Sequence, residues 1–352
     1  MVNTCWRWCP RFLCGFHLVN RPGLDPAREA ARQWFDECSL QPLGSGHIHD
    51  TYLAESQAGR FVLQCVNESV FRDGDLVMRQ TQRLLDHLDE SYPFTIPRLR
   101  LSREGRSSER VASKLWRTWH YVEDTIVVDP LSGAGQAWAA GHAFAVLQRQ
   151  LAGLTPQLGE TIPGFLQLAH YLREFDEVAA KAPSDLRECV VRHRHLAELF
   201  AEHNAHIHGD CKVNNLLFDS AGSQVVAIID FDTAMYGHWA WDFGDLVRSI
   251  FYSRGGVDCD LYRAALTGFL EGNPRPDATS LQFVAAPLYV TLMLAVRFLT
   301  DHLRGDRYFK VAQRGDNLQR SREQFGLFDE MASFDATMHT IAAEVISRSE
   351  RS

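Results

Sequence analysis

Residues 206–219 read His-Ile-His-Gly-Asp-Cys-Lys-Val-Asn-Asn-Leu-Leu-Phe-Asp, and residues 225–232 read Val-Val-Ala-Ile-Ile-Asp-Phe-Asp. This stretch contains two apolar runs that each end in polar residues, and such runs predict short strands. Strands of this kind would carry Asp210, Lys212, Asn215 and Asp230 into one small space. These four side chains are therefore the first candidates for a functional site.

The four residue types suit the chemistry of phosphoryl transfer. Asp210 in a turn can accept the proton of a hydroxyl group, and Lys212 can lie near the transferring group as a point charge. Asn215 and Asp230 offer oxygen ligands to Mg²⁺, which prefers few protein ligands together with phosphate and water. The spacing Asp-x-Lys-x-x-Asn is that of the protein-kinase catalytic loop, and Asp-Phe-Asp stands where the metal-binding Asp-Phe-Gly would be. Asp-Phe-Asp alone is more often a turn, but the combined motifs predict a phosphoryl-transfer site.

Bulk properties narrow the class of protein. A chain of 352 residues suits two lobes, and its 45% hydrophobic and 23% charged residues are ordinary for a globular enzyme. The net charge of −8 makes nucleic acid an unfavourable partner. The eight cysteines have no Cys-x-x-Cys spacing, which favours reduced thiols in a cytoplasmic protein. Residues 283–296 are shorter than the ~20 residues of a membrane span and predict a buried helix.

The N-terminal part predicts a small, strand-rich lobe. Residues 1–24 have no continuous apolar core and are predicted to be a disordered extension, not a signal peptide. A helix is expected over 27–38, followed by strands over 43–54 and 61–66 that form a hairpin, a helix over 75–88, and strands over 96–101 and 112–122. Gly44 and Gly46 lie in a turn that can cover nucleotide phosphates, although Gly-x-Gly alone is usually an ordinary turn. The backbone of a connector that includes Tyr121 and Glu123 can pair with an adenine edge.

From residue 135 onward the sequence predicts mainly helices, which the catalytic stretch interrupts. They are expected at 136–151, 166–182, 185–205, 241–252, 261–270, 281–303 and 317–331. This gives an N-terminal nucleotide-binding lobe at 25–122 and a catalytic and substrate-binding lobe at 123–352. No long exposed heptad pattern is present, so a monomer is expected.

Motifs from about residue 40 to residue 328 match a known family in order. They are Gly46-His47-Ile48-His49-Asp50-Thr51-Tyr52, Gln64-Cys65-Val66-Asn67-Glu68-Ser69-Val70-Phe71, Trp116-Arg117, Thr161-Ile162-Pro163-Gly164-Phe165, His208-Gly209-Asp210 with Asn215, Ile229-Asp230-Phe231-Asp232-Thr233, Asp242-Phe243-Gly244-Asp245, Arg297-Phe298-Leu299-Thr300-Asp301 and Gly305-Asp306-Arg307-Tyr308-Phe309. In these motifs the chain resembles the aminoglycoside phosphotransferase and choline kinase superfamily, and within it the N-acetylhexosamine 1-kinase group.

The resemblance implies an α+β, protein-kinase-like bilobal fold with a small antiparallel β lobe and a larger, mainly helical lobe. It implies ATP as co-substrate, Mg²⁺ held by Asn215 and Asp230, and a sugar whose anomeric hydroxyl is oriented by Asp210. Arg297, Tyr308 and His47 match positions that contact the sugar in that group, and Asp230 is also expected to face the substrates. Without the resemblance, Arg297 is better interpreted as the charged end of a buried helix and Tyr308 as a packed aromatic.

One departure concerns the third-strand position, which usually carries a phosphate-binding basic residue and is Gln64 here. The sugar-kinase group is similar in this respect, and Lys212 becomes the chief lysine candidate for contact with the transferring phosphate. Gln64 is nevertheless expected to lie in the nucleotide site. Asp242 and Asp245 are interpreted as structural carboxylates. Two alternatives remain at this stage: a kinase of the same fold acting on an aminoglycoside, choline or another alcohol, and a catalytically silent nucleotide-binding protein.

Overall fold

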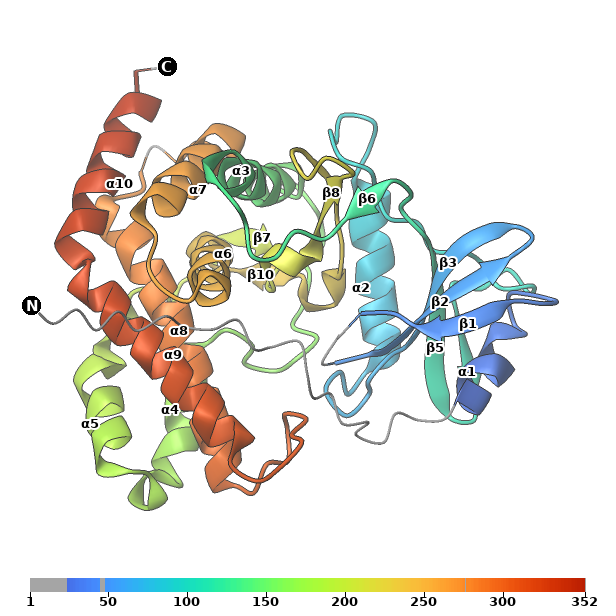
Figure 1. Ribbon diagram of the computed structural model, residues 1–352, viewed down its shortest axis with the longest axis horizontal. Coiled ribbons are helices and arrows are strands. Elements are labelled where there is room, and N and C mark those ends of the chain that lie inside the picture. The colour runs from blue at the N-terminus through green and yellow to red at the C-terminus, as the bar shows by residue number, and fades with distance from the viewer. Residues whose placement is uncertain (1–23, 45–47, 276, 352) are drawn as a thin grey trace, which may run out of the picture.

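The computed structural model describes residues 24–44, 48–275 and 277–351. Its fold is α+β and protein-kinase-like, with an antiparallel sheet in the N-terminal part and a larger helical region after it (Figure 1). The prediction that residues 1–24 are disordered falls outside the described residues, except for Leu24, which begins helix α1.

The N-terminal sheet has five strands in the order β1-β2-β3-β5-β4, all paired antiparallel. Its strands are β1 Ser39–Pro42, β2 Asp50–Ser56, β3 Gly59–Cys65, β4 Ser108–Val111 and β5 Lys114–His120. The predicted hairpin is therefore present as β2 and β3. The run at 96–101 is not a strand, because it makes only the single bridge Leu99–Trp119; Pro97 lies within it, and proline cannot donate to a ladder.

Helix α1 Leu24–Ala31 is shorter than the predicted helix 27–38. Trp34 and Phe35, the apolar residues of the predicted helix, are buried beyond its end. The indole Nε1 of Trp34 donates a hydrogen bond to the carbonyl oxygen of Arg100 at 2.9 Å. Tertiary packing thus replaces the last helical turns and leads the chain into β1.

Helix α2 Gly74–His87 crosses between the sheet and the helical region (Figure 1). Its first turn is capped by the carboxylate of Asp73, which accepts the N–H of Leu76 at 2.8 Å. Val77, Leu84 and Leu85 belong to the same buried cluster as the large helical region. The sheet and α1 form a second cluster, and Met78 of α2 packs with Val66 and with Leu115 of β5 in a third, smaller one.

Two small sheets carry the catalytic stretch. Strands β7 Ala205–Ile207 and β10 Met235–Gly237 pair antiparallel, and β6 Thr125–Ile126, β8 Leu216–Asp219 and β9 Val225–Ile228 form a three-stranded sheet. Short 3-10 turns η3 Val213–Asn215 and η4 Phe231–Thr233 adjoin these strands. The predicted pair of short strands around the catalytic residues is confirmed as β8 and β9.

The helical region surrounds these sheets. Its helices are α3 Ala134–Gln150, α4 Leu168–Asp176, α5 Ser184–His193, α6 Trp239–Arg254, α7 Cys259–Gly272, α8 Ser280–Leu303, α9 Asp316–Ser333 and α10 Asp335–Ser349, with 3-10 turns η1 Ala179–Lys181 and η2 Arg194–Glu198. The predicted helices 166–182 and 185–205 are too long, since each gives way to a 3-10 turn. Helix α10 was not predicted.

Helix α8 is long and apolar enough to cross a membrane by length and composition, and it is the one such helix in the described residues. However, 78% of its most apolar window is buried inside the protein. Its first turn is closed by a capping box of Thr279 and Gln282. The prediction of a buried helix over 283–296 is confirmed.

Candidate active site

The catalytic loop leaves β7 through a glycine that no other residue can replace without strain. Gly209 has φ of 80°, and a Cβ atom there would lie 2.6 Å from the carbonyl oxygen of Thr233. The carboxylate of Asp242, in the first turn of α6, accepts the N–H groups of His208 and Gly209, each at 2.9 Å. It also accepts the side-chain amide of Gln148 at 2.8 Å. Asp242 is thus a brace for the catalytic loop, as the structural interpretation of this carboxylate expects.

Asp210, Lys212 and Asn215 lie together, as the spacing predicts. The Nζ of Lys212 is 2.9 Å from Oδ2 of Asp210. The side-chain amide of Asn215 donates to the carbonyl oxygen of Asp210 at 2.8 Å and to its Oδ2 at 3.0 Å. Burial alone would raise the pKa of Asp210, but Lys212, His208 and Asn215 hold it below its ordinary value. Asp210 is therefore a carboxylate at neutral pH, which a group that accepts a hydroxyl proton must be.

The arrangement of Asn215 also bears on metal binding. Because its Nδ2 is committed to Asp210, its Oδ1 remains free of any hydrogen-bond donor in the described part of the chain. Asp230 follows β9 in the left-handed conformation, with φ of 68°. Burial first, and then the nearby Asp232, raise the pKa of Asp230. A partly buried carboxylate crowded by another one favours a cation, and a free amide oxygen is a ligand that suits Mg²⁺.

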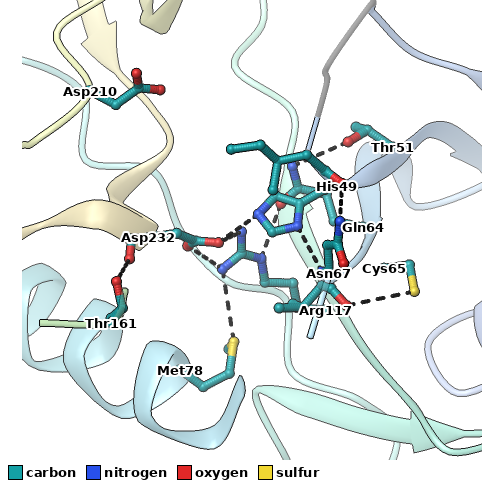
Figure 2. Close-up of polar contacts among 12 residues, drawn as sticks. His49, Thr51, Gln64, Cys65, Asn67, Met78, Arg117, Thr161, Asp210 and Asp232 are labelled. Atoms are coloured by element: carbon teal, nitrogen blue, oxygen red, sulfur yellow. Dashed lines mark hydrogen bonds and ion pairs between the residues drawn. The ribbon is translucent and has the colours of Figure 1, made fainter. Parts of the chain in front are cut away.

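A second set of metal-ligand types is His49, Asp230 and Asp232, whose ligand atoms lie within 4.8 Å of one another. Asp232 is already fully engaged (Figure 2). Arg117 donates from Nη1 and Nη2 to its two oxygens at 2.6 and 2.8 Å, and Nε2 of His49 lies 2.8 Å from Oδ2. Burial would raise the pKa of Asp232, but Arg117 and His49 outweigh it and hold that pKa well below the ordinary value. The geometry therefore favours an ion pair at Asp232 over a metal ligand.

A cavity of about 270 Å³ opens between the five-stranded sheet and the catalytic strands. Gly44, Gln64 and Tyr121, three of the predicted nucleotide-site residues, line it, as does Asp230. Another predicted nucleotide residue, Glu123, is not among the lining residues, and its side chain pairs with Arg60 at the surface. The role expected of the connector's backbone stays a prediction. Most other lining residues are apolar, namely Leu43, Val62, Pro97, Trp119, Val122, Val127, Leu217, Ile229 and Phe231. Gly46 and His47 lie outside the described residues.

Arg297 and Tyr308, predicted from the resemblance, are brought together. Nη2 of Arg297 donates to the hydroxyl of Tyr308 at 3.3 Å. The guanidinium carbon lies 4.8–5.4 Å from the ring centroids of Phe165, Tyr171, Tyr308 and Phe309. Burial would lower the pKa of Arg297, but the nearby Tyr171, Tyr308 and Asp210 raise it. The guanidinium is thus held as a cation among these aromatic rings, close enough to Asp210 for the two charges to interact.

The loop that carries Tyr308 is folded around a carboxylate. Asp301, near the end of α8, accepts the N–H groups of Arg307, Tyr308 and Phe309, each at 2.9 Å. It also accepts the side-chain amide of Asn317 at 2.9 Å. Four donors to one buried side chain hold the loop rigidly beside Arg297.

A comparison with known proteins identifies the family to which this chain belongs. A model described as the phosphotransferase enzyme family matches residues 39–279, which is more than half of the chain. The chain belongs to this family. It is a phosphotransferase that uses an alcohol group as acceptor.

Solved structures share the fold of this phosphotransferase at low sequence identity. A microcompartment-associated aminopropanol kinase has a TM-score of 0.62 at 18% identity, covering 90% of this chain and 98% of that chain. A choline/ethanolamine kinase family protein from Mesorhizobium loti has a TM-score of 0.62 at 15% identity, covering 92% and 99%. The amicoumacin kinase hAmiN, in complex with AMP-PNP and Ca²⁺, has a TM-score of 0.62 at 12% identity, covering 88% and 94%. These likenesses show a common fold.

Several residues of the phosphotransferase site were not predicted from the sequence. Arg117 and His49 occur in the motifs that carry the resemblance, but no role was inferred for either. In the sequence, Asp232 stands out only as the last residue of Asp-Phe-Asp. A carboxylate in place of the kinase glycine was the available signal, because a buried charge needs a partner of opposite sign. Asp245 is bound by Arg248 at 2.7 Å and stays structural.

Proposed function

We propose that this phosphotransferase transfers the γ-phosphoryl group of ATP to the anomeric hydroxyl of an N-acetylhexosamine or a related hexose. The new bond joins the sugar O1 oxygen to the γ-phosphorus, and the bond from that phosphorus to the β–γ bridging oxygen breaks, which leaves ADP. Asp210 accepts the hydroxyl proton. Mg²⁺, when bound, neutralises charge on the phosphate oxygens, and Asn215 and Asp230 are the residues that would hold it.

The observation that supports a sugar is the cationic acceptor side. Aminoglycosides, choline and amino alcohols carry positive charge, and they would meet the Arg297 guanidinium within its ring of aromatic side chains. Like charges in a partly buried site repel each other. Neutral hydroxyl and acetamido oxygens instead accept hydrogen bonds from a guanidinium, and aromatic rings can pack on the C–H face of a sugar. A neutral hexose therefore suits this site better than a cation.

The competing acceptor class is an amino alcohol, since solved structures of the same fold include an aminopropanol kinase and a choline/ethanolamine kinase family protein. A catalytically silent nucleotide-binding protein is the other alternative. The presence and mutual contact of Asp210 and Asn215, together with Asp230, favour activity over silence.

The test is a screen for ADP release from ATP with and without Mg²⁺. The acceptors are neutral hexoses and N-acetylhexosamines on one side, and choline, ethanolamine, aminopropanol and aminoglycosides on the other. We expect turnover with the sugars, and phosphorus NMR should place the new phosphate on C1. Asp210→Asn should lower kcat by about 10²–10⁴-fold with little change in sugar binding. Preferred turnover of a cationic alcohol, or ATP binding without turnover on any acceptor, would overturn the proposal.

A further inference from the structure

The wall of the nucleotide cavity has an unusual distribution of charge. On the third strand, where the broader kinase pattern has a basic residue, β3 presents the neutral Gln64. Its partner across the ladder on β5 is Arg117. Arg117 and Gln64 both line the cavity, and Arg117, whose side chain is only 1% exposed, is the one lysine or arginine among the described residues that do so. A cation is therefore present in this wall, one strand away from its usual position.

Arg117 is held in place by several side chains (Figure 2). Its Nε donates to Oε1 of Gln64 at 3.0 Å, and that oxygen also accepts Nε1 of Trp119 at 2.8 Å. Its Nη1 and Nη2 donate to the two oxygens of Asp232. The guanidinium carbon lies 5.1 Å from the ring centroid of Trp119. The orientation of the guanidinium is thus fixed in the protein without any ligand.

These contacts leave Arg117 with spare donor capacity. A guanidinium has five N–H groups. Nε uses one, Nη1 uses one on Asp232 and has Sδ of Met78 at 4.0 Å, and Nη2 uses one on Asp232. One Nη2 hydrogen has no acceptor in the part of the chain that the structure describes. A buried ion pair is seldom a net source of stability, so its presence in a ligand cavity invites a functional explanation.

We propose that Arg117 supplies the cationic contact to the α- and β-phosphates of the nucleotide that position 64 does not provide. Gln64, Asp232 and His49 act as positioning residues, which hold the guanidinium and tie it to the loop of Asp230. The role assigned to Gln64 thereby changes from contact with the nucleotide to support for Arg117. This assignment rests on the proposed function for its nucleotide, but not on the identity of the acceptor.

The test distinguishes a direct contact of Arg117 with phosphate from a purely structural role, in which Arg117 only links the five-stranded sheet to the loop of Asp230. Calorimetry with Mg²⁺ present would give the Kd of adenosine, ADP and ATP for the wild-type protein and for Arg117→Met. We expect adenosine affinity within about twofold of wild type, and a loss of about 10- to 100-fold for ADP and ATP, as for a lost charge-assisted hydrogen bond. KM for ATP should rise while KM for the acceptor stays the same.

Two further variants address folding and charge. Arg110→Met is the matched control, because Arg110 lies on the neighbouring strand β4, pairs with Glu68 at 2.9 Å and does not line the cavity. It should bind all three ligands as the wild type does. In the double variant Gln64→Lys/Arg117→Met the cation returns to the third strand, and ADP affinity should largely recover.

Three results would overturn the assignment. Arg117→Met could weaken adenosine as much as ADP, which would show a structural role, or it could leave ADP affinity unchanged. The double variant could fail to regain ADP affinity although it folds, as judged by circular dichroism. If the wild-type protein bound neither adenosine nor ADP, the proposed function itself would fall and the assignment with it; a wrong acceptor alone would leave these nucleotide affinities untouched.

Discussion

Asp242→Asn tests how far the catalytic loop depends on one buried carboxylate. Asp242 accepts three hydrogen bonds, from the N–H groups of His208 and Gly209 and from the side chain of Gln148. Asparagine keeps one accepting oxygen and turns an NH₂ group toward a peptide N–H, which then loses its acceptor at a cost of about 1–3 kcal/mol. The two remaining bonds change from a charged to a neutral acceptor, at roughly 1 kcal/mol each. The free energy of unfolding should fall by about 3–5 kcal/mol.

Catalysis should suffer in the same variant, because the loop that Asp242 braces carries the base Asp210. A displacement of about 1 Å in a catalytic group can cost on the order of 10²-fold in rate. Urea unfolding followed by tryptophan fluorescence would give the stability, and kcat would be measured where the variant is fully folded. Asp36→Asn is the control, since its side chain is 94% exposed and its pair with Arg103 should be worth at most about 1 kcal/mol. Stability within about 0.5 kcal/mol of wild type, together with unchanged kcat, would refute the bracing role.

Three other predictions concern packing, pH and the acceptor loop. Gly141→Ala should lower the free energy of unfolding by about 3 kcal/mol or more, because its Cβ would lie 2.1 Å from the carbonyl oxygen of Ala265. Gly135→Ala is the control in the same helix: its Cβ meets open space, so the variant should be nearly neutral in thermal unfolding. Burial, aided by nearby cationic groups, lowers the pKa of His238 to about 4. The stability linked to this neutral histidine is therefore complete above pH 6.5 and is lost as the pH falls toward 4. His238→Asn should flatten the pH dependence of urea unfolding between these two pH values, and an unchanged slope would contradict the linkage. Asp301→Asn should raise KM for the acceptor more than KM for ATP in steady-state kinetics, because it loosens the loop that carries Tyr308. Equal changes in the two KM values would contradict the expected role of this loop.

The sequence could predict those contacts of the site that join residues close together in the chain. Asp210, Lys212 and Asn215 fall within six residues of one another, and their contacts follow from that spacing once the flanking strands form. The pairs Arg117–Asp232 and His49–Asp232 join residues 115 and 183 positions apart. No local pattern encodes which distant charge a buried carboxylate will meet, because that depends on how the five-stranded sheet packs against the turn η4.

The errors in the predicted elements have the same origin. The apolar spacing over 27–38 predicts a helix, but the helix ends at Ala31. Beyond that residue, the indole of Trp34 instead donates a hydrogen bond to the carbonyl oxygen of Arg100. Arg297 and Tyr308 were predicted only through resemblance, and their mutual hydrogen bond could not be derived from a helix end and a loop.

The buried clusters of the sheet and of the helical region are largely separate, so local unfolding is expected to affect the two regions differently. Helix α2 follows the sheet strand β3 in sequence, yet Val77, Leu84 and Leu85 pack with the large helical region and only Met78 packs against the sheet, whose main core is shared with α1. Cooperative units of local unfolding follow packing more closely than chain order. Amide hydrogens of α2 should therefore exchange with solvent together with those of the helical region, while the five-stranded sheet exchanges sooner, in a smaller opening that uncovers the nucleotide cavity and leaves the catalytic loop intact.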